Sequence, residues 1–472
     1  MDKFIGRRNE LEALGRLYEK EGFQMMVLYG RRRVGKSTLI KEFIKGKRAI
    51  YYTASKTGIR NNLEKLGKQV LAEMAPELGA LVFQDMDTLF SFIGKRCMEE
   101  RLVFVIDELP YLAEADDGVL SVIQNHIDGE WASGQMFLIL CGSSISFMEN
   151  EVLSEKSPVF GRRRAQIKLE PFSYMEAAEF VPAYSETDKA VCYGITGGIA
   201  KYLSLMDDSF SLDENIVNQF FTKSGYMYEE TNNLLMQEFR NVSTYNDIIE
   251  AVASGANKVN EIADKTHIEP TRVSHALANL IVTGIVVKEY AITDEANKKK
   301  VQYKFKDNML KFWYRFVPDA VGAIELGKGD VYYQNIVKNR ISEYMGEVFE
   351  DMARYYTLKL GLCGELNCFV TSVGKWWGTN PRKHETTDID IVGLDKQSKK
   401  AVLGECKYKN EPIDKKVYDT LLERNGLISG TYTVVQYLLF SKKGFSDWMM
   451  GQTDQGLVKL ISLQDMYRVS NR

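Results

Sequence analysis

The chain has 472 residues, of which 45% are hydrophobic and 26% are charged. This length and composition are typical of a soluble globular protein of roughly three domains. The formal net charge is -3, so bulk charge predicts neither nucleic-acid nor membrane binding, and any basic surface must be local. The longest apolar runs, such as 136–141, are far too short to span a bilayer.

The N-terminus shows no apolar segment of the signal-peptide type, because charged residues follow Phe4 closely. The spacing of the cysteines matches neither a zinc pattern nor a disulfide framework. We therefore expect a cytoplasmic protein with reduced and mostly buried thiols. The cysteines are Cys97, Cys141, Cys192, Cys363, Cys368 and Cys406.

A phosphate-binding loop follows the first apolar strand of the chain. Residues 30–37 read G-x-x-x-x-G-K-S and open a helix, which is the Walker A pattern in its required context. Backbone N–H groups of such a loop and the helix N-terminus attract phosphate, while Lys36 would reach the β- and γ-phosphates and Ser37 would bind Mg²⁺. The expected ATP-binding residues are Gly30, Arg31, Arg32, Arg33, Val34, Gly35, Lys36, Ser37 and Thr38.

Two acidic residues follow a second apolar run. Residues 102–106 are continuously apolar, as expected of a parallel strand buried on both faces, and Asp107 and Glu108 come next. Ligands of open α/β sheets bind at this carboxyl end of the strands. We expect Asp107 to hold Mg²⁺ together with Ser37, and Glu108 to deprotonate the attacking water.

A winged helix-turn-helix is predicted from about Tyr245 onward. Three short apolar-periodic helices, the third beginning at Pro270, precede two strand-like segments at 284–288 and 301–305. The third helix would enter a major groove and basic residues of the hairpin tip would contact phosphates; docking of a protein partner is the alternative. The candidate DNA contacts are Thr271, Arg272, Ser274, His275 and Asn279 of the helix, and Lys298, Lys299 and Lys300 of the tip.

The last part of the chain carries a pattern of metal-dependent nucleases. A strand at 388–392 and a strand at 401–407 are predicted to pair. Because side chains of a strand repeat every two residues, Asp390, Glu405 and Lys407 should share one face. This is the PD-(D/E)xK constellation, in which the two acids would bind Mg²⁺ and Lys407 would orient water or stabilise developing charge. A helix-borne acid completes such a site, either Glu350 or, as the alternate, Glu347.

The order of these parts resembles a prokaryotic family, common in archaea and found in bacteria, that joins an archaeal-type AAA+/STAND-like ATPase, a winged helix and a C-terminal PD-(D/E)xK domain. The resemblance rests most strongly on 30–38 and 103–108 and also on 390–407. It implies ATP hydrolysis, and it implies that residues 6–10 lie near the adenine.

The same resemblance implies several further roles. Ser143 or Ser144, at the end of the predicted strand 136–141, would contact the γ-phosphate or the water. Arg162 or Arg163 would be an arginine finger that serves a neighbouring subunit. Residues 197–203 would lie over the nucleotide as part of a helical lid, although Ala200 stands where the family usually has proline.

The sequence therefore predicts a multi-domain α/β protein: a P-loop ATPase core (1–172), a helical lid (173–238), a winged helix (239–324) and a nuclease-like domain (325–472), with a linker at 325–330. We expect an ATPase whose nucleotide state governs DNA binding and Mg²⁺-dependent DNA cleavage, in a homo-oligomer without membrane contact. The alternative is an ATP-dependent regulatory switch, for transcription or partner docking, whose nuclease-like domain is inactive. A protein-binding platform is a third interpretation of the last domain.

Overall fold

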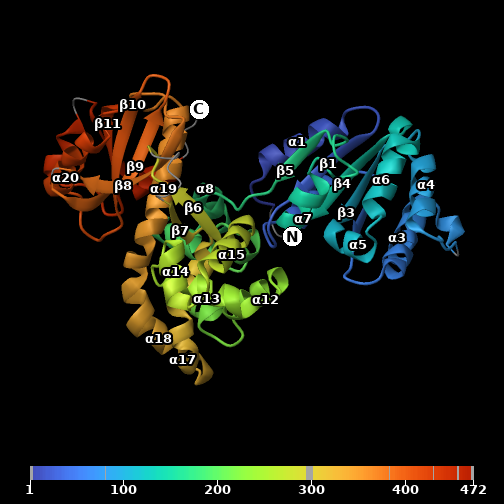
Figure 1. The fold of residues 1–472 in the computed structure, drawn as a ribbon, viewed down its shortest axis with the longest axis horizontal. Helices are drawn as coiled ribbons and strands as arrows, with labels where there is room; N and C mark the ends of the chain where they lie inside the picture. Colours follow the sequence, from blue (N-terminus) through green and yellow to red (C-terminus); the bar gives the residue numbers. More distant parts are fainter. Residues whose placement is uncertain are drawn as a thin grey trace. The chain divides into compact units, whose positions relative to one another are not determined.

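The computed structural model describes residues 4–79, 81–293, 301–381, 383–428, 430–453 and 456–468. The chain divides into two compact units, which are treated separately below (Figure 1). The first unit comprises residues 1–172 together with 199–201, and the second comprises residues 173–198 together with 202–472. Within the described residues, no helix combines the length and apolar character needed to cross a bilayer.

The first unit is built on a five-stranded parallel sheet with the strand order β2-β3-β4-β1-β5. The central strands β1, β3 and β4 are buried along their whole length, because their sequences are continuously apolar. The predicted α/β fold of this part is thereby confirmed. The strands are β1 (Gln24–Tyr29), β2 (Ala49–Thr53), β3 (Leu102–Asp107), β4 (Met136–Gly142) and β5 (Ala165–Lys168).

Helices connect these strands and cover the sheet. Leu14 of α1 and Leu39 of α2 pack into one apolar core with strand residues such as Val105. The helices are α1 (Arg8–Tyr18), α2 (Lys36–Phe43), α3 (Ile59–Met74), α4 (Met86–Arg96), α5 (Leu109–Ala115), α6 (Val119–Asp128) and α7 (Ile145–Phe147). Residues 30–35 separate β1 from α2, and Glu108 alone separates β3 from α5, so both of these loops at the carboxyl edge are short.

The second unit begins with helices and a hairpin. Strands β6 and β7 pair antiparallel, with Val286 opposite Phe305. The three helices and two strands expected between 242 and 305 are therefore present, while their assignment as a winged helix stays a prediction. The elements are α8 (Tyr174–Ala177), α9 (Glu186–Thr196), α11 (Leu212–Phe220), α12 (Tyr226–Glu238), α13 (Val242–Ala253), α14 (Val259–Thr266), α15 (Pro270–Val282), β6 (Val286–Tyr290) and β7 (Val301–Phe305). Helix α10 (Ala200–Leu203) begins in the first unit and ends in the second.

The rest of the second unit contains a mixed sheet with the order β12-β11-β10-β9-β8. Strands β9 and β10 pair, as the sequence predicts, and they run antiparallel. The long helix α19 packs against β8, β9 and β10. The elements are α16 (Asn308–Phe316), α17 (Val321–Glu325), α18 (Gly329–Tyr332), α19 (Ile341–Leu362), β8 (Ser372–Asn380), β9 (Glu385–Asp395), β10 (Lys400–Lys407), α20 (Lys415–Arg424), β11 (Thr433–Ser441), α21 (Asp447–Met450), β12 (Val458–Ser462) and α22 (Leu463–Tyr467).

The stretch 325–330, whose composition suggested a linker, is a packed turn between two helices. Helix α17 ends at Glu325 and α18 begins at Gly329. The Gly329 backbone lies so close to Phe221 that a Cβ atom at Gly329 would lie 1.9 Å from the Phe221 carbonyl oxygen. Composition indicated a turn here but could not show that the turn is buried against α11 and its C-terminal cap.

Candidate functional site

The phosphate-binding loop of the first unit is held in a tight curl. Gly30 and Gly35 have φ angles of 151° and 102°, a region that other residues rarely adopt. An alanine at Gly30 would place its Cβ atom 2.4 Å from the carbonyl oxygen of Leu169. The Lys36 Nζ atom donates to the carbonyl oxygens of Gly30 (2.8 Å) and Arg31 (3.0 Å), and burial lowers the pKa of this lysine.

The other predicted loop residues differ in exposure. Val34 is buried, Arg31, Arg32 and Arg33 are half-buried, and Thr38 is exposed on the first turn of α2. The segment 199–201 contacts the phosphate-binding loop, because the Lys201 N–H donates to the Arg33 carbonyl oxygen at 3.1 Å. Part of the predicted lid segment therefore lies directly against the phosphate-binding loop.

Asp107 lies beside Ser37 at the carboxyl end of β3. Its Oδ2 atom accepts hydrogen bonds from the Ser37 hydroxyl (3.0 Å) and from the Tyr51 hydroxyl, and its Oδ1 atom accepts from the Glu108 N–H (3.0 Å). A hydroxyl and a carboxylate oxygen this close are ligands of the type that Mg²⁺ prefers. Ser37 and Asp107 therefore fit a magnesium ion.

Glu108 follows Asp107 in a strained conformation. Its φ angle is 55°, which is uncommon for a residue with a side chain. Its carboxylate accepts two hydrogen bonds from Ser143, one from the backbone N–H at 3.2 Å and one from the hydroxyl. Ser144 instead caps α7 by accepting a bond from the Phe147 N–H. Of the two candidate serines, Ser143 alone contacts the expected base.

Two further residues contribute to this site: Tyr51, which was missed from the sequence, and Arg7, which belongs to the segment 6–10 that the resemblance placed near the adenine. Tyr51 of β2 was read only as a strand residue, yet its hydroxyl bonds to Asp107 because β2 lies next to β3. Arg7 is buried, and its guanidinium donates to the carbonyl oxygens of Val34 (3.2 Å) and Glu170 (2.7 Å). Arg7 thus ties the phosphate-binding loop to the segment after β5. The signal for Tyr51 was only its place in a predicted strand, whereas the signal for Arg7 was the resemblance of residues 6–10 to a segment that lies near the adenine.

The two candidate arginine fingers are both engaged within their own unit. The Arg162 Nε atom donates to Asp128 at 2.7 Å, and its Nη1 atom donates to the carbonyl oxygens of Pro158 (2.9 Å) and Phe160 (3.0 Å). The Arg163 Nε atom donates to the Gln166 side chain at 2.8 Å. To serve a neighbouring subunit, Arg162 would have to leave Asp128.

Most of the predicted recognition residues are accessible in the second unit. Thr271, Arg272, Ser274 and His275 of α15 are exposed. Asn279 is not available for a base contact, since it is half-buried and its Nδ2 atom donates to the Tyr245 hydroxyl at 2.7 Å. The remaining candidates, Lys298, Lys299 and Lys300, lie outside the described residues.

Asp390 and the E-x-K pair meet at the β9–β10 edge. Asp390 is buried, and its Oδ2 atom accepts a hydrogen bond from the Cys406 N–H at 3.0 Å. Glu405 is also buried and forms ion pairs with Lys407 (2.7 Å) and Arg424 (2.7 Å). Burial and the nearby charge of Asp390 raise the pKa of Glu405 above its ordinary value.

The helix-borne acids of α19 have different surroundings. Burial and the charge of Asp390 raise the pKa of Glu350 to about 7, although Lys375 lies 3.3 Å away. Glu347 is exposed and pairs with Lys311 instead. Among the described residues, no group of three or more His, Cys, Asp or Glu side chains is arranged to hold a metal ion. Glu350, Asp390 and Glu405 are thus neighbours that do not form the expected metal site in this arrangement, because cations engage both glutamates.

Two family models match this chain. Residues 4–206 match the model of an ATPase domain predominantly from Archaea. Residues 313–419 match the model of archaeal and bacterial proteins of unknown function. The first match spans the whole parallel sheet and the segment 199–201, and the second spans α19 and the strands that carry Asp390, Glu405 and Lys407.

One similar protein matches nearly the whole chain, and others match only part of it. An uncharacterized protein of Methanocaldococcus jannaschii is 29% identical over 93% of this chain and 96% of its own length. An uncharacterized ATP-binding protein of the same organism is 47% identical over 10% of this chain and 76% of its own length. Among solved structures, the Walker-type ATPase of Pyrococcus abyssi has a TM-score of 0.49 with 19% identity, covering 66% of this chain and 96% of that chain.

Proposed function

We propose that this chain binds ATP with Mg²⁺ and hydrolyses it to ADP and phosphate. The match of residues 4–206 to the model of an ATPase domain predominantly from Archaea supports this proposal. One observation carries the proposal: a curled loop bearing Lys36 and Ser37 stands against Asp107, whose neighbour Glu108 is held by Ser143. Phosphate-binding loops with this constellation position a triphosphate and a water for in-line attack.

Each of these residues has a role in the proposed reaction. Lys36 exchanges its bonds to the Gly30 and Arg31 carbonyls for bonds to the β- and γ-phosphates. Ser37 and Asp107 would hold a Mg²⁺ ion, and such an ion would supply positive charge against the charge developing on the phosphates. Glu108 accepts the proton of the attacking water. Burial of the loop lowers the local dielectric constant and strengthens these interactions.

A substitution of Lys36 tests the proposal. We expect Lys36→Ala to abolish ATP turnover, because no other group replaces its charge next to the γ-phosphate. Lys45→Ala is the matched control, since Lys45 is an exposed lysine just after the same helix and pairs with Glu42. Unchanged phosphate release in Lys36→Ala would refute the site, and equal loss in both variants would point to damaged folding.

We also propose that the second unit binds DNA, with residues 242–305 acting as a winged helix-turn-helix. Exposed Arg272 and its neighbours on α15 support this proposal. The alternative is a regulatory switch that docks a partner without contacting DNA. An ATPase assay with and without duplex DNA across a salt series separates the two: stimulation that falls steeply with salt supports DNA binding, and an ATPase rate indifferent to DNA supports the switch.

Metal-dependent DNA cleavage is the second candidate function. Asp390, Glu405 and Lys407 favour it, because the two acids are close enough for one to raise the pKa of the other and Lys407 pairs with Glu405. Since cations now occupy the carboxylates that would bind a metal, we assign no reaction step to a metal there.

We further propose that Arg162 acts on a neighbouring subunit in a homo-oligomer, which a sizing run with and without a non-hydrolysable ATP analogue tests.

A further inference from the structure

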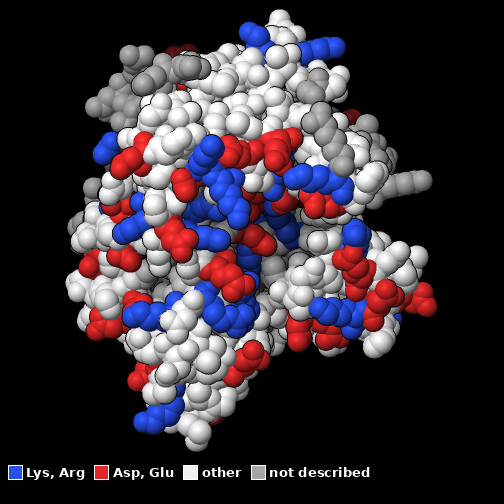
Figure 2. All heavy atoms as spheres, turned by 90° about the vertical axis from the view of Figure 1, so that its left-hand side faces the viewer, with Lys and Arg blue, Asp and Glu red and all other residues white. Residues whose placement is uncertain are grey.

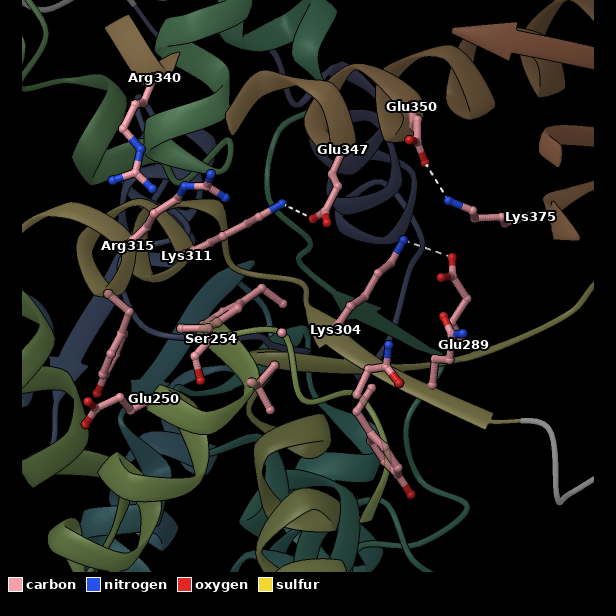
Figure 3. A pocket seen from close by; sticks show the side chains of 18 of the residues that line it. Glu250, Ser254, Glu289, Lys304, Lys311, Arg315, Arg340, Glu347, Glu350 and Lys375 are labelled. Atoms are coloured by element: carbon pink, nitrogen blue, oxygen red, sulfur yellow. Dashed lines mark hydrogen bonds and ion pairs between the residues drawn. The ribbon is translucent and has the colours of Figure 1, made fainter. Parts of the chain in front are cut away.

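A cleft in the second unit lies between the β6–β7 hairpin and α19 (Figure 3). Its volume is about 630 Å³, within the range of known ligand sites. Basic side chains enter it from five parts of the chain: β7, α16, the residue before α19, α19 itself, and β8. They are Lys304, Lys311, Arg315, Arg340, Arg354 and Lys375, and we call this space the basic cleft.

Two guanidinium groups converge at one end of the basic cleft. Arg315 and Arg340 both lie over the ring of Phe316, at 5.7 and 5.5 Å from its centroid, and they point toward one another (Figure 3). Arg315 pairs with Glu343, an exposed residue outside the cleft, while its buried Nε atom has no hydrogen-bond partner. Like charges placed together repel, and a bound anion would relieve that repulsion.

The acidic residues of the cleft are mostly paired with its lysines. Glu289 pairs with Lys304 at 2.8 Å, Glu347 pairs with Lys311, and Glu350 pairs with Lys375 at 3.3 Å. These pairs are the dashed lines of Figure 3. Within the described part of the chain, Arg340 forms no ion pair. On the face drawn in Figure 2, Lys and Arg side chains gather around a hollow and alternate with acidic ones.

The cleft also reaches the candidate nuclease site. Glu350 and Lys375 line its other end, and Arg354, which also lines the cleft, donates to the carbonyl oxygen of Asp390 at 2.9 Å. A chain of phosphates bound by Arg340, Arg315 and Lys311 would therefore extend toward the β9–β10 edge. A small phosphate compound would need only one end of such a cleft, whereas a polynucleotide backbone would use its whole length.

We propose that the basic cleft binds the sugar–phosphate backbone of DNA and directs it toward the edge that carries Asp390, Glu405 and Lys407. This inference rests on the proposed DNA binding by the second unit and adds the path that the backbone takes. Phosphate contacts position DNA without reading its sequence. The path therefore predicts binding that depends on salt and hardly on sequence.

Anisotropy of a labelled short DNA duplex, measured with the full chain in EDTA, tests the path. We expect Arg315→Gln and Arg340→Gln each to weaken binding by about tenfold, and each to reduce the slope of log affinity against log salt by about 0.9. Lys338→Gln is the matched control, since it removes a charge two residues from Arg340 but pairs with Asp213 outside the cleft. Thermal unfolding of each variant checks that the fold is kept.

A gain of affinity provides a test that misfolding could not imitate. Glu347→Gln removes the acid that competes for Lys311, so we expect DNA to bind about two- to fivefold more tightly. Glu423→Gln is the control, because Glu423 pairs with Lys383 on the exposed surface. Equal affinities in these two variants would contradict a phosphate contact at Lys311.

The outcomes separate the path from the proposed function. If the wild-type chain binds no DNA at any salt concentration, DNA binding itself fails, and the path fails with it. If the wild type binds but the two cleft variants match Lys338→Gln while Arg272→Ala loses binding, DNA lies on α15 and the cleft assignment alone is wrong. Displacement of DNA by micromolar inorganic pyrophosphate would make the cleft a small-phosphate site and overturn the proposed path.

Discussion

Ser143 donates two hydrogen bonds to the carboxylate of Glu108, one from its backbone N–H and one from its hydroxyl. Because the Glu108 backbone has a positive φ angle, its side chain leaves β3 toward the end of β4, where Ser143 lies. The serine therefore fixes the orientation of the residue that we propose as the general base.

We predict that Ser143→Ala lowers kcat for ATP and leaves KM unchanged. The lost bond to a charged group is worth about 1.5–3 kcal/mol, which corresponds to a fall in kcat of about ten- to hundredfold if orientation matters fully in the transition state. Steady-state phosphate release measures both constants. An increase in kcat would show that Ser143 restrains Glu108 in an unreactive position instead of orienting it.

Tyr51 supports the carboxylate of Asp107 from the neighbouring strand. We predict that Tyr51→Phe raises the Mg²⁺ concentration needed for half-maximal ATP turnover about fivefold, because a net hydrogen bond is worth about 1 kcal/mol. Tyr52→Phe is the control: it removes a hydroxyl that bonds to Asn62 at 2.6 Å, on the other face of β2. An equal Mg²⁺ requirement in the two variants would mean that Tyr51 does not position Asp107.

The sequence predicted features that depend on local patterns. Continuous apolar runs identified the buried strands that end at Asp107 and at Gly142, and the G-x-x-x-x-G-K-S spacing identified the loop around Lys36. These features depend only on residues that are close to one another in the sequence. Contacts such as Tyr51 with Asp107 depend on which strands lie side by side, and that order follows from the whole domain.

The candidate nuclease site also contains contacts between distant parts of the chain that the sequence did not predict. The two-residue period placed Glu405 and Lys407 on one face, and the structure pairs them. The two-residue period did not reveal Arg424, which lies on α20 and forms the second ion pair of Glu405. It also did not reveal Lys375, which lies on β8 and pairs with Glu350. Cations from distant elements therefore decide whether the acids are available for a metal.

DNA cleavage is tested by nicking of supercoiled plasmid with Mg²⁺ or Mn²⁺. We predict that Asp390→Asn and Lys407→Ala abolish nicking, because one removes a carboxylate that would bind a metal once the cations beside Glu350 and Glu405 move away, and the other removes the cation that would stabilise the attacked phosphate. Asp395→Asn is the control, as it alters a half-buried acid at the other end of the same strand, where its carboxylate accepts a hydrogen bond from the Ser398 N–H. If the wild-type chain does not nick the plasmid with either metal, the proposed DNA cleavage is wrong.

Alanine substitutions at two glycines of α19 should change the free energy of unfolding in opposite directions. Gly361 is buried against Val370, and an added Cβ atom would lie 2.5 Å from the Val370 Cβ atom and 2.8 Å from its carbonyl oxygen. Gly346 of the same helix has open space around it, with nothing within 4 Å of an added Cβ atom. The two positions therefore differ in packing, while both belong to the same helix.

We predict that Gly361→Ala lowers the free energy of unfolding by about 1–3 kcal/mol, because the backbone of α19 must shift to admit the methyl group. Gly346→Ala should raise it by about 0.5–1 kcal/mol, since alanine loses less conformational entropy in a helix. Thermal unfolding of the full chain should show the midpoint falling in the first variant and rising in the second, by about 2–4 °C per kcal/mol. Equal shifts in the two variants would contradict the packing of α19 against the segment before β8, and with it the placement of Glu350 near Asp390.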